Sequence, residues 1–60
     1  MPCVLIVDDE LSIRQVLQEI VTVYGYEAQT AQSAKEALGI LPKKKIDLIM
    51  LDLSMPDITG

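Results

Sequence analysis

The chain has no histidine, tryptophan or phenylalanine, and its 60 residues include one cysteine, Cys3. Without histidine, and with a single thiol, it cannot build a Cys/His zinc site. One cysteine also excludes an internal disulfide framework, so we interpret Cys3 as a small buried hydrophobe. A free thiol fits a reducing compartment, and we therefore expect a cytoplasmic protein.

Basic residues are scarce. Five Lys and Arg face nine Asp and Glu, for a net charge of −4, which argues against direct binding of nucleic acid. Three of the lysines are consecutive, at 43–45, and such a short run is more typical of a solvated turn than of a binding patch. Long apolar runs and a basic leader are also missing, so we expect neither a membrane span nor a signal peptide.

Half of the residues are apolar, which excludes a disordered acidic tail. The continuous apolar run 3–7 and the segment 46–51, which is apolar except at Asp47, are typical of strands buried on both faces of a parallel sheet. Residues 11–24 show helical spacing, and the weaker segment 26–31 indicates a short strand. A second helix is predicted over 33–41.

The ends of the two helices also have sequence signals. Gly25 is expected to stop the first helix. Ser33 and Glu36 have the spacing of a capping box at the start of the second helix, and Pro42 ends it. The apolar stripe predicted for the first helix consists of Ile13, Val16, Leu17, Ile20 and Tyr24.

The predicted order of strands and helices, β-α-β-α-β, implies a parallel sheet with right-handed crossovers. Such sheets bind ligands at the carboxyl ends of their strands. Asp8 and Asp9 follow the first apolar strand, and Asp52 follows the last. If these strands are neighbours, about 4.8 Å apart, three carboxylates converge on one cleft.

A cluster of carboxylates needs a compensating cation, and oxygen ligands favour Mg²⁺ or Mn²⁺. An Asp carboxylate can also act as the nucleophile in aspartyl-phosphate chemistry. A single acidic residue at a strand end is often only a loop residue or an N-cap. The Asp8–Asp9 pair together with Asp52 makes that interpretation less favourable here.

Two sequence segments carry a family resemblance. Residues 4–10, VLIVDDE, are similar to the acidic strand end that opens response-regulator receiver domains, and residues 47–56, DLIMLDLSMP, resemble their phosphoacceptor segment. The resemblance implies that residues 1–60 are the N-terminal half of a receiver domain. It implies a flavodoxin-like α/β fold, a parallel sheet truncated to β-α-β-α-β with strand order 2-1-3.

The resemblance also implies roles for individual residues. Asp52 is the expected phosphoacceptor and a metal ligand, Asp9 a direct ligand of Mg²⁺, and Asp8 a ligand through water. The backbone carbonyl of Ser54 completes the protein's share of the coordination, and Pro56 shapes the adjoining loop. We expect the donor to be a phosphohistidine on a sensor histidine kinase that docks partly on the first helix. The chain is expected to accept a phosphoryl group and not to be an enzyme.

Receiver domains continue with two more strands and three more helices, which carry a Lys that pairs with the phosphoryl group. We therefore expect the 60 residues to be a piece of a longer protein, with slow or absent phosphoryl labelling by themselves. Ordering the chain costs about 90 kcal/mol at ~1.5 kcal/mol per residue. Burying roughly 3,400 Å² of apolar surface offsets about 85 kcal/mol, so a monomer is marginal.

The strand at 46–53 then has an open apolar edge, which predicts a homodimer or higher oligomer that completes the sheet. A self-associating interaction or assembly module without phosphotransfer is the alternative function. An Asp-nucleophile phosphatase ranks lower, because those enzymes usually separate their two Asp residues by one residue, whereas Asp8 and Asp9 are adjacent. No Gly-rich loop follows a strand, so a nucleotide site ranks lowest.

Overall fold

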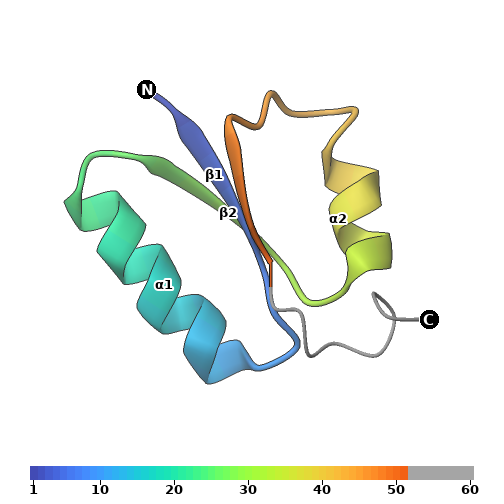
Figure 1. The fold of residues 1–60 in the computed structure, drawn as a ribbon, viewed down its shortest axis with the longest axis horizontal. Helices are drawn as coiled ribbons and strands as arrows, with labels where there is room; N and C mark the ends of the chain where they lie inside the picture. Colours follow the sequence, from blue (N-terminus) through green and yellow to red (C-terminus); the bar gives the residue numbers. More distant parts are fainter. Residues whose placement is uncertain (52–60) are drawn as a thin grey trace.

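A computed structural model describes residues 1–51, and Figure 1 shows how their helices and strands are arranged. In chain order these are β1 (Cys3–Val7), α1 (Leu11–Val23), β2 (Glu27–Ala31), α2 (Ala34–Ile40) and β3 (Leu48–Leu51). The three strands form one sheet in the order β2-β1-β3, and both pairings are parallel. The predicted parallel sheet and its 2-1-3 order are confirmed.

Strand β1 is the centre of the fold. It pairs with β2 from Cys3 opposite Glu27 to Val7 opposite Ala31, and with β3 up to Val7 opposite Leu51. All five β1 residues are buried. A strand with neighbours on both edges and helices on both faces hides every side chain, which explains its unbroken apolar sequence.

The helices lie on opposite faces of the sheet (Figure 1). On the α2 face, Leu5 and Val7 form a buried cluster with Ala31 and Ala37. On the α1 face, Val4 and Ile6 pack with Val21, next to Leu17, Ala28 and Met50. Successive β1 side chains thus alternate between two small cores, as the pleat of a strand requires.

Helix α1 presents a different face to the sheet than the predicted stripe. Leu17 is half-buried, which agrees with part of the prediction, and Val21, outside the predicted stripe, is buried. The rest was wrong: Ile13, Val16, Ile20 and Tyr24 are 41%, 53%, 47% and 75% exposed. The inward line runs through positions 14, 17 and 21, whose spacing of three and four residues puts them on one side of a helix.

The predicted helix ends are largely correct. Gly25 has φ +88°, its N–H donates to the Thr22 carbonyl (3.0 Å), and the Tyr26 N–H donates to the Val21 carbonyl (3.0 Å). This pair of bonds is a Schellman motif, which favours glycine at the left-handed position. At the start of α2, the Ser33 hydroxyl accepts a hydrogen bond from the Glu36 N–H at 3.1 Å.

Strand β3 is not the doubly buried strand that its sequence predicts. It begins at Leu48, and Leu48, Ile49 and Leu51 are 58%, 45% and 44% exposed. The reason is that, among residues 1–51, β3 has β1 on one side only and neither helix packs closely against its faces. Neither helix in the described part of the chain is long and apolar enough to cross a membrane.

Candidate metal site at the carboxyl end of the sheet

The acidic pair follows β1 directly, at the carboxyl end of the sheet. Asp8 continues the ladder with β2, since its N–H donates to the Ala31 carbonyl at 3.1 Å. Asp8 is 7% exposed and Asp9 is exposed. The chain turns here from strand to helix, and the Glu10 N–H donates to Asp8 Oδ1 at 2.9 Å. This bond across two residues is an Asx-type turn, which fixes the Asp8 carboxylate.

Arg14, which sequence reasoning missed, also contacts this turn. Its Nη1 donates to the Asp8 backbone carbonyl at 2.7 Å, the short distance of a charge-assisted bond. Arg14 is half-buried on the inward line of α1. The sequence does contain a signal for this contact, because Arg14 lies at helical spacing from Leu17 and Val21. The signal can be used only when the face of the helix that packs on the sheet is known.

The carboxyl ends of β1 and β3 lie side by side, as the sequence predicts. The last paired residues are Val7 and Leu51, and the residues that follow them in sequence are Asp8 and Asp52. Next to α1 a hollow of about 310 Å³ opens between these ends, lined by residues that include Asp8, Glu10, Ile13, Leu17 and Met50. Asp52, Ser54 and Pro56 lie outside the described residues.

The donors in the described part of this site suit a hard cation. Asp8 and Asp9 supply carboxylate oxygens, the ligand type that Mg²⁺ prefers. Asp8 is buried, and the guanidinium of Arg14 contacts its carbonyl and not its carboxylate. Within residues 1–51, however, no group of three or more His, Cys, Asp or Glu side chains could hold a metal ion. A complete donor set therefore needs residues beyond Leu51.

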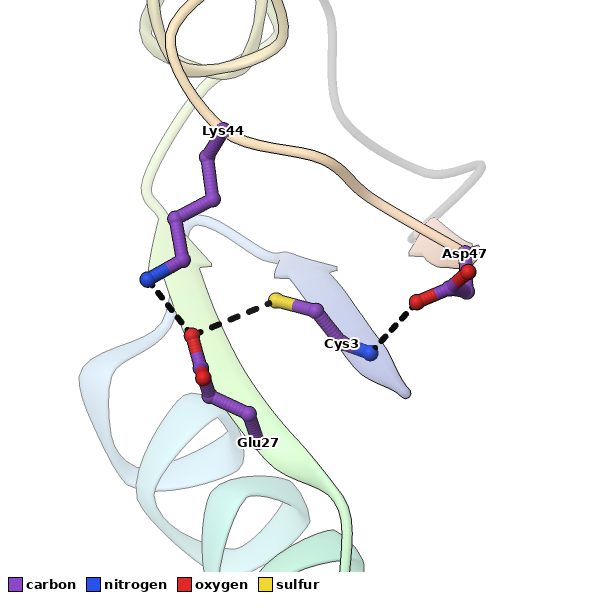
Figure 2. A network of polar contacts seen from close by, with 4 residues as sticks. All are labelled: Cys3, Glu27, Lys44 and Asp47. Atoms are coloured by element: carbon purple, nitrogen blue, oxygen red, sulfur yellow. Dashed lines mark hydrogen bonds and ion pairs between the residues drawn. The ribbon is translucent and has the colours of Figure 1, made fainter. Parts of the chain in front are cut away.

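The amino end of the same sheet holds a different group of charges (Figure 2). Lys44 Nζ and Glu27 Oε2 are 2.5 Å apart, and the Cys3 thiol lies 3.8 Å from the same Glu27 oxygen. Asp47 Oδ2 accepts a hydrogen bond from the Cys3 N–H (2.7 Å), and the Asp47 N–H donates to the Cys3 carbonyl (2.9 Å). We call Cys3, Glu27, Lys44 and Asp47 the amino-end network.

Protonation within the amino-end network follows these contacts. The hydrogen bond and positive charge of Lys44 lower the pKa of Glu27, and Glu27 in turn raises the pKa of Lys44. Burial, followed by the charge of Glu27, raises the pKa of the Cys3 thiol. The cysteine is buried, as predicted, and these effects keep it in the protonated, unreactive form.

A hollow of about 560 Å³ at this end is lined by residues that include Pro2, Cys3, Lys43 and Lys45. It contains none of the site residues that the sequence predicts. Lys44 is engaged by Glu27, while all three lysines are exposed in a turn. This agrees with the interpretation of the lysine run as a solvated turn.

The chain belongs to the response regulator receiver domain family, which it matches over residues 4–60. It is 50% identical over 56 residues to the probable transcriptional regulator ycf27 of Cyanidium caldarium. The matched region covers 93% of the chain and 22% of that protein. It is 39% identical over 57 residues to sporulation initiation phosphotransferase F of Bacillus subtilis (strain 168), covering 95% of the chain and 46% of the relative.

Solved structures agree with this assignment. The response regulator TrrA of Thermotoga maritima, in complex with Mg²⁺-BeF, superposes with a TM-score of 0.89 at 43% identity, over 97% of the chain and 50% of TrrA. TrrA in complex with the histidine kinase ThkA gives a TM-score of 0.87. The chain thus spans about half the length of these structures, and less than a quarter of the ycf27 protein.

These comparisons correct one expectation from the sequence. The chain was expected to be a phosphoacceptor and not an enzyme. The Bacillus relative is named a phosphotransferase, so membership of this family does not separate acceptors from enzymes. The expectation failed because a carboxylate that receives a phosphoryl group and passes it on takes part in group transfer itself.

Proposed function

We propose that the chain is the phosphoacceptor part of a two-component phosphorelay in the cytoplasm. Asp52 receives a phosphoryl group from a phosphohistidine of a sensor histidine kinase. Asp8, Asp9, Asp52 and the backbone carbonyl of Ser54 hold Mg²⁺, with Asp8 acting through water. The observation that carries the proposal is the parallel register that ends β1 and β3 together, at Val7 and Leu51.

This register supports a shared site because neighbouring strands lie about 4.8 Å apart. The residues that follow Val7 and Leu51 in sequence are both aspartates. The family match covers the segment that contains Asp52 and Ser54. A relative in this family is known with Mg²⁺-BeF and another structure pairs it with a histidine kinase.

In the transfer, a carboxylate oxygen of Asp52 forms a bond to phosphorus as the phosphorus–nitrogen bond of the phosphohistidine breaks. The electron pair of that bond stays on the imidazole nitrogen, which takes up a proton. Asp8 and Asp9 help to bind the metal and set its place at the sheet edge. Bound Mg²⁺ neutralises the carboxylates and stabilises negative charge on the phosphoryl oxygens.

The test is phosphoryl labelling with Mg²⁺ and acetyl phosphate, followed by mass spectrometry of the intact chain. We expect labelling of the 60 residues to be slow, with at most one adduct per chain, stable in acid and labile in base, as an acyl phosphate is. Asp52→Asn should abolish the adduct, and chelation of Mg²⁺ should prevent it. The matched control is Asp47→Asn, which removes a carboxylate from the opposite end of the sheet. Adduct formation that survives in Asp52→Asn would contradict the assignment.

Among residues 1–51 the outer edge of β3 has no partner strand, which favours a second candidate function, self-association. Three of the four β3 side chains, Leu48, Ile49 and Leu51, are exposed apolar groups, and edge strands of this kind pair readily with other strands. The proposed occupant is the β3 edge of a second copy, which gives a symmetric dimer. Sedimentation velocity should show a dimer that Leu48→Lys converts to a monomer. A folded monomer of the unaltered chain at high concentration would contradict this candidate.

A further inference from the structure

Arg14 is the only arginine in the chain, and it lies on the one side of α1 that faces the sheet. Leu17 and Val21, one and two turns further along that side, pack against β1. The Arg14 side chain is half-buried and reaches back across the turn to Asp8. A charged side chain loses hydration in such a position, so its hydrogen bond must offset that loss.

The atom that Arg14 binds is informative. A guanidinium beside an acidic pair would ordinarily form an ion pair with a carboxylate. Here Nη1 instead donates to the Asp8 backbone carbonyl at 2.7 Å, while Asp8 Oδ1 accepts from the Glu10 N–H. The peptide between Asp8 and Asp9 is thereby fixed at its carbonyl oxygen, while a second hydrogen bond in the same turn holds the Asp8 carboxylate.

This peptide links the two side chains that the proposed function assigns to metal binding. Fixing its plane sets the direction in which Asp9 leaves the backbone, and it prevents the turn from relaxing as the carboxylates repel one another. Because the guanidinium binds the carbonyl, it occupies no carboxylate oxygen. Fixing the peptide thus lowers the cost of holding Asp8 and Asp9 ready for a divalent ion.

We infer that Arg14 is a positioning residue for divalent-cation binding, acting through the carbonyl of Asp8. The inference rests on the proposed function, because it assumes that Asp8 and Asp9 bind the metal. Residues that support metal ligands through hydrogen bonds typically contribute about 10–100-fold in metal affinity. Loss of the Arg14 contact should therefore weaken metal binding without removing any ligand of the metal.

The experiment measures Mn²⁺ affinity of the full chain from the electron paramagnetic resonance signal of free Mn²⁺. The variants are Arg14→Gln, Arg14→Lys and, as control, Lys45→Gln, which makes the same change of charge at the amino end of the sheet. We expect Arg14→Gln to bind Mn²⁺ about tenfold more weakly and Lys45→Gln to match the unaltered chain. Arg14→Lys, which keeps the charge and a donor, should recover part of the affinity.

A second measurement needs no metal. Amide hydrogen exchange of Glu10 reports the bond from its N–H to Asp8 Oδ1, and it should become faster in Arg14→Gln while the amides of β1 exchange as before. If Arg14→Gln does not fold, Arg14→Lys must still bind Mn²⁺ more weakly than Lys45→Gln does, and equal affinities overturn the inference.

The outcomes separate this inference from the proposed function. If the unaltered chain binds Mn²⁺ and Arg14→Gln binds it equally well, the role of Arg14 is wrong and the metal site stands. If Lys45→Gln weakens binding as much as Arg14→Gln, net charge explains the effect and the positioning role is again wrong. If the unaltered chain does not bind Mn²⁺, both proposals fall.

Discussion

The two ends of the β-sheet use acidic residues in opposite ways. At the amino end, Glu27 has Lys44 as a cationic partner and Asp47 binds both polar groups of the Cys3 backbone. At the carboxyl end, the guanidinium of Arg14 donates to the backbone carbonyl of Asp8 and does not bind the carboxylates of Asp8 and Asp9. Within residues 1–51, the ion pair lies at the amino end alone.

We interpret the amino-end charges as structural and the carboxyl-end pair as part of the proposed metal site. Carboxylates at the amino end are matched by partners of the same chain, so they stabilise the pairing of the strands and need no ligand. Carboxylates at the other end are held in place but are not neutralised by a basic side chain in the described part of the chain. Carboxylates held in place without a basic partner keep oxygens available to a cation, as the proposed metal site requires.

The largest effect should come from the strand that both ends share. Leu5 is fully buried at the middle of β1, and Leu5→Ala should lower the free energy of unfolding by about 2–5 kcal/mol. Urea unfolding followed by circular dichroism measures the change. The exposed Leu38→Ala in α2 is the control and should have little effect. A Leu5→Ala chain of unchanged stability would show that β1 is not the centre of the fold.

The next effect should be confined to the carboxyl end. Asp9→Ala removes an exposed ligand and should weaken Mg²⁺ binding by about 100-fold or more, beyond the loss typical of a supporting residue. Metal-free stability should stay the same or rise, because one of two repelling carboxylates is gone. Isothermal titration calorimetry and thermal unfolding measure the two quantities. Glu27→Gln, at the amino end, should leave Mg²⁺ affinity unchanged.

At the amino end, Asp47→Ala should change stability and leave metal binding alone. The variant leaves the Cys3 N–H without its side-chain acceptor, at a cost of about 1–3 kcal/mol. Asp47→Asn retains an acceptor oxygen and should lose less. Urea unfolding measures the cost, and a Mg²⁺ titration serves as the control. If Asp47→Ala instead weakened Mg²⁺ binding as much as Asp9→Ala, the division between the two ends would be wrong.

The smallest effect concerns the exposed ion pair of Lys44 and Glu27. Because Lys44 lowers the pKa of Glu27 from its ordinary value of 4.5, the pair contributes stability that is fully present above pH 4.5. That stability is lost as the pH falls through the lowered pKa. The melting temperature of the unaltered chain should therefore be slightly higher than that of Lys44→Gln near neutral pH. The difference between the two melting temperatures should disappear in acid.

Lys43→Gln is the matched control, since Lys43 is an exposed neighbour in the same turn. Its melting temperature should follow that of the unaltered chain at every pH. A gap between the unaltered chain and Lys44→Gln that stays constant through the acid range would mean that the ion pair does not supply the difference.

Much of the fold follows from local sequence signals. The apolar run of β1 and the stop at Gly25 each act within a few residues, and the structure has them where they were predicted. The alternation of strands and helices predicted a parallel sheet, and the family resemblance implied the order of its strands. The proposed site residues Asp8 and Asp9 were predicted because they follow a buried strand immediately, and their role stays a prediction.

What the sequence concealed depends on contacts between distant residues. Apolar side chains surround α1, from Leu11 through Val16 to Val23, so helical spacing alone does not single out the face with Leu17. The role of Arg14 depends on that face. The burial of β3 was misjudged because an apolar run does not indicate whether a strand is central or at an edge. The Lys44–Glu27 pair joins segments that only the folded sheet brings together.

The most direct test of the account is whether one divalent ion sits between the ends of β1 and β3. Substoichiometric Mn²⁺ added to an isotopically labelled chain broadens the amide signals of residues close to the ion. We predict that the signals of residues 8–10 and 52–54 broaden together, that those of Glu27 and Lys44 stay sharp, and that Asp9→Ala removes the effect at both segments. Broadening at one segment without the other, or at the amino end, would contradict a shared metal site.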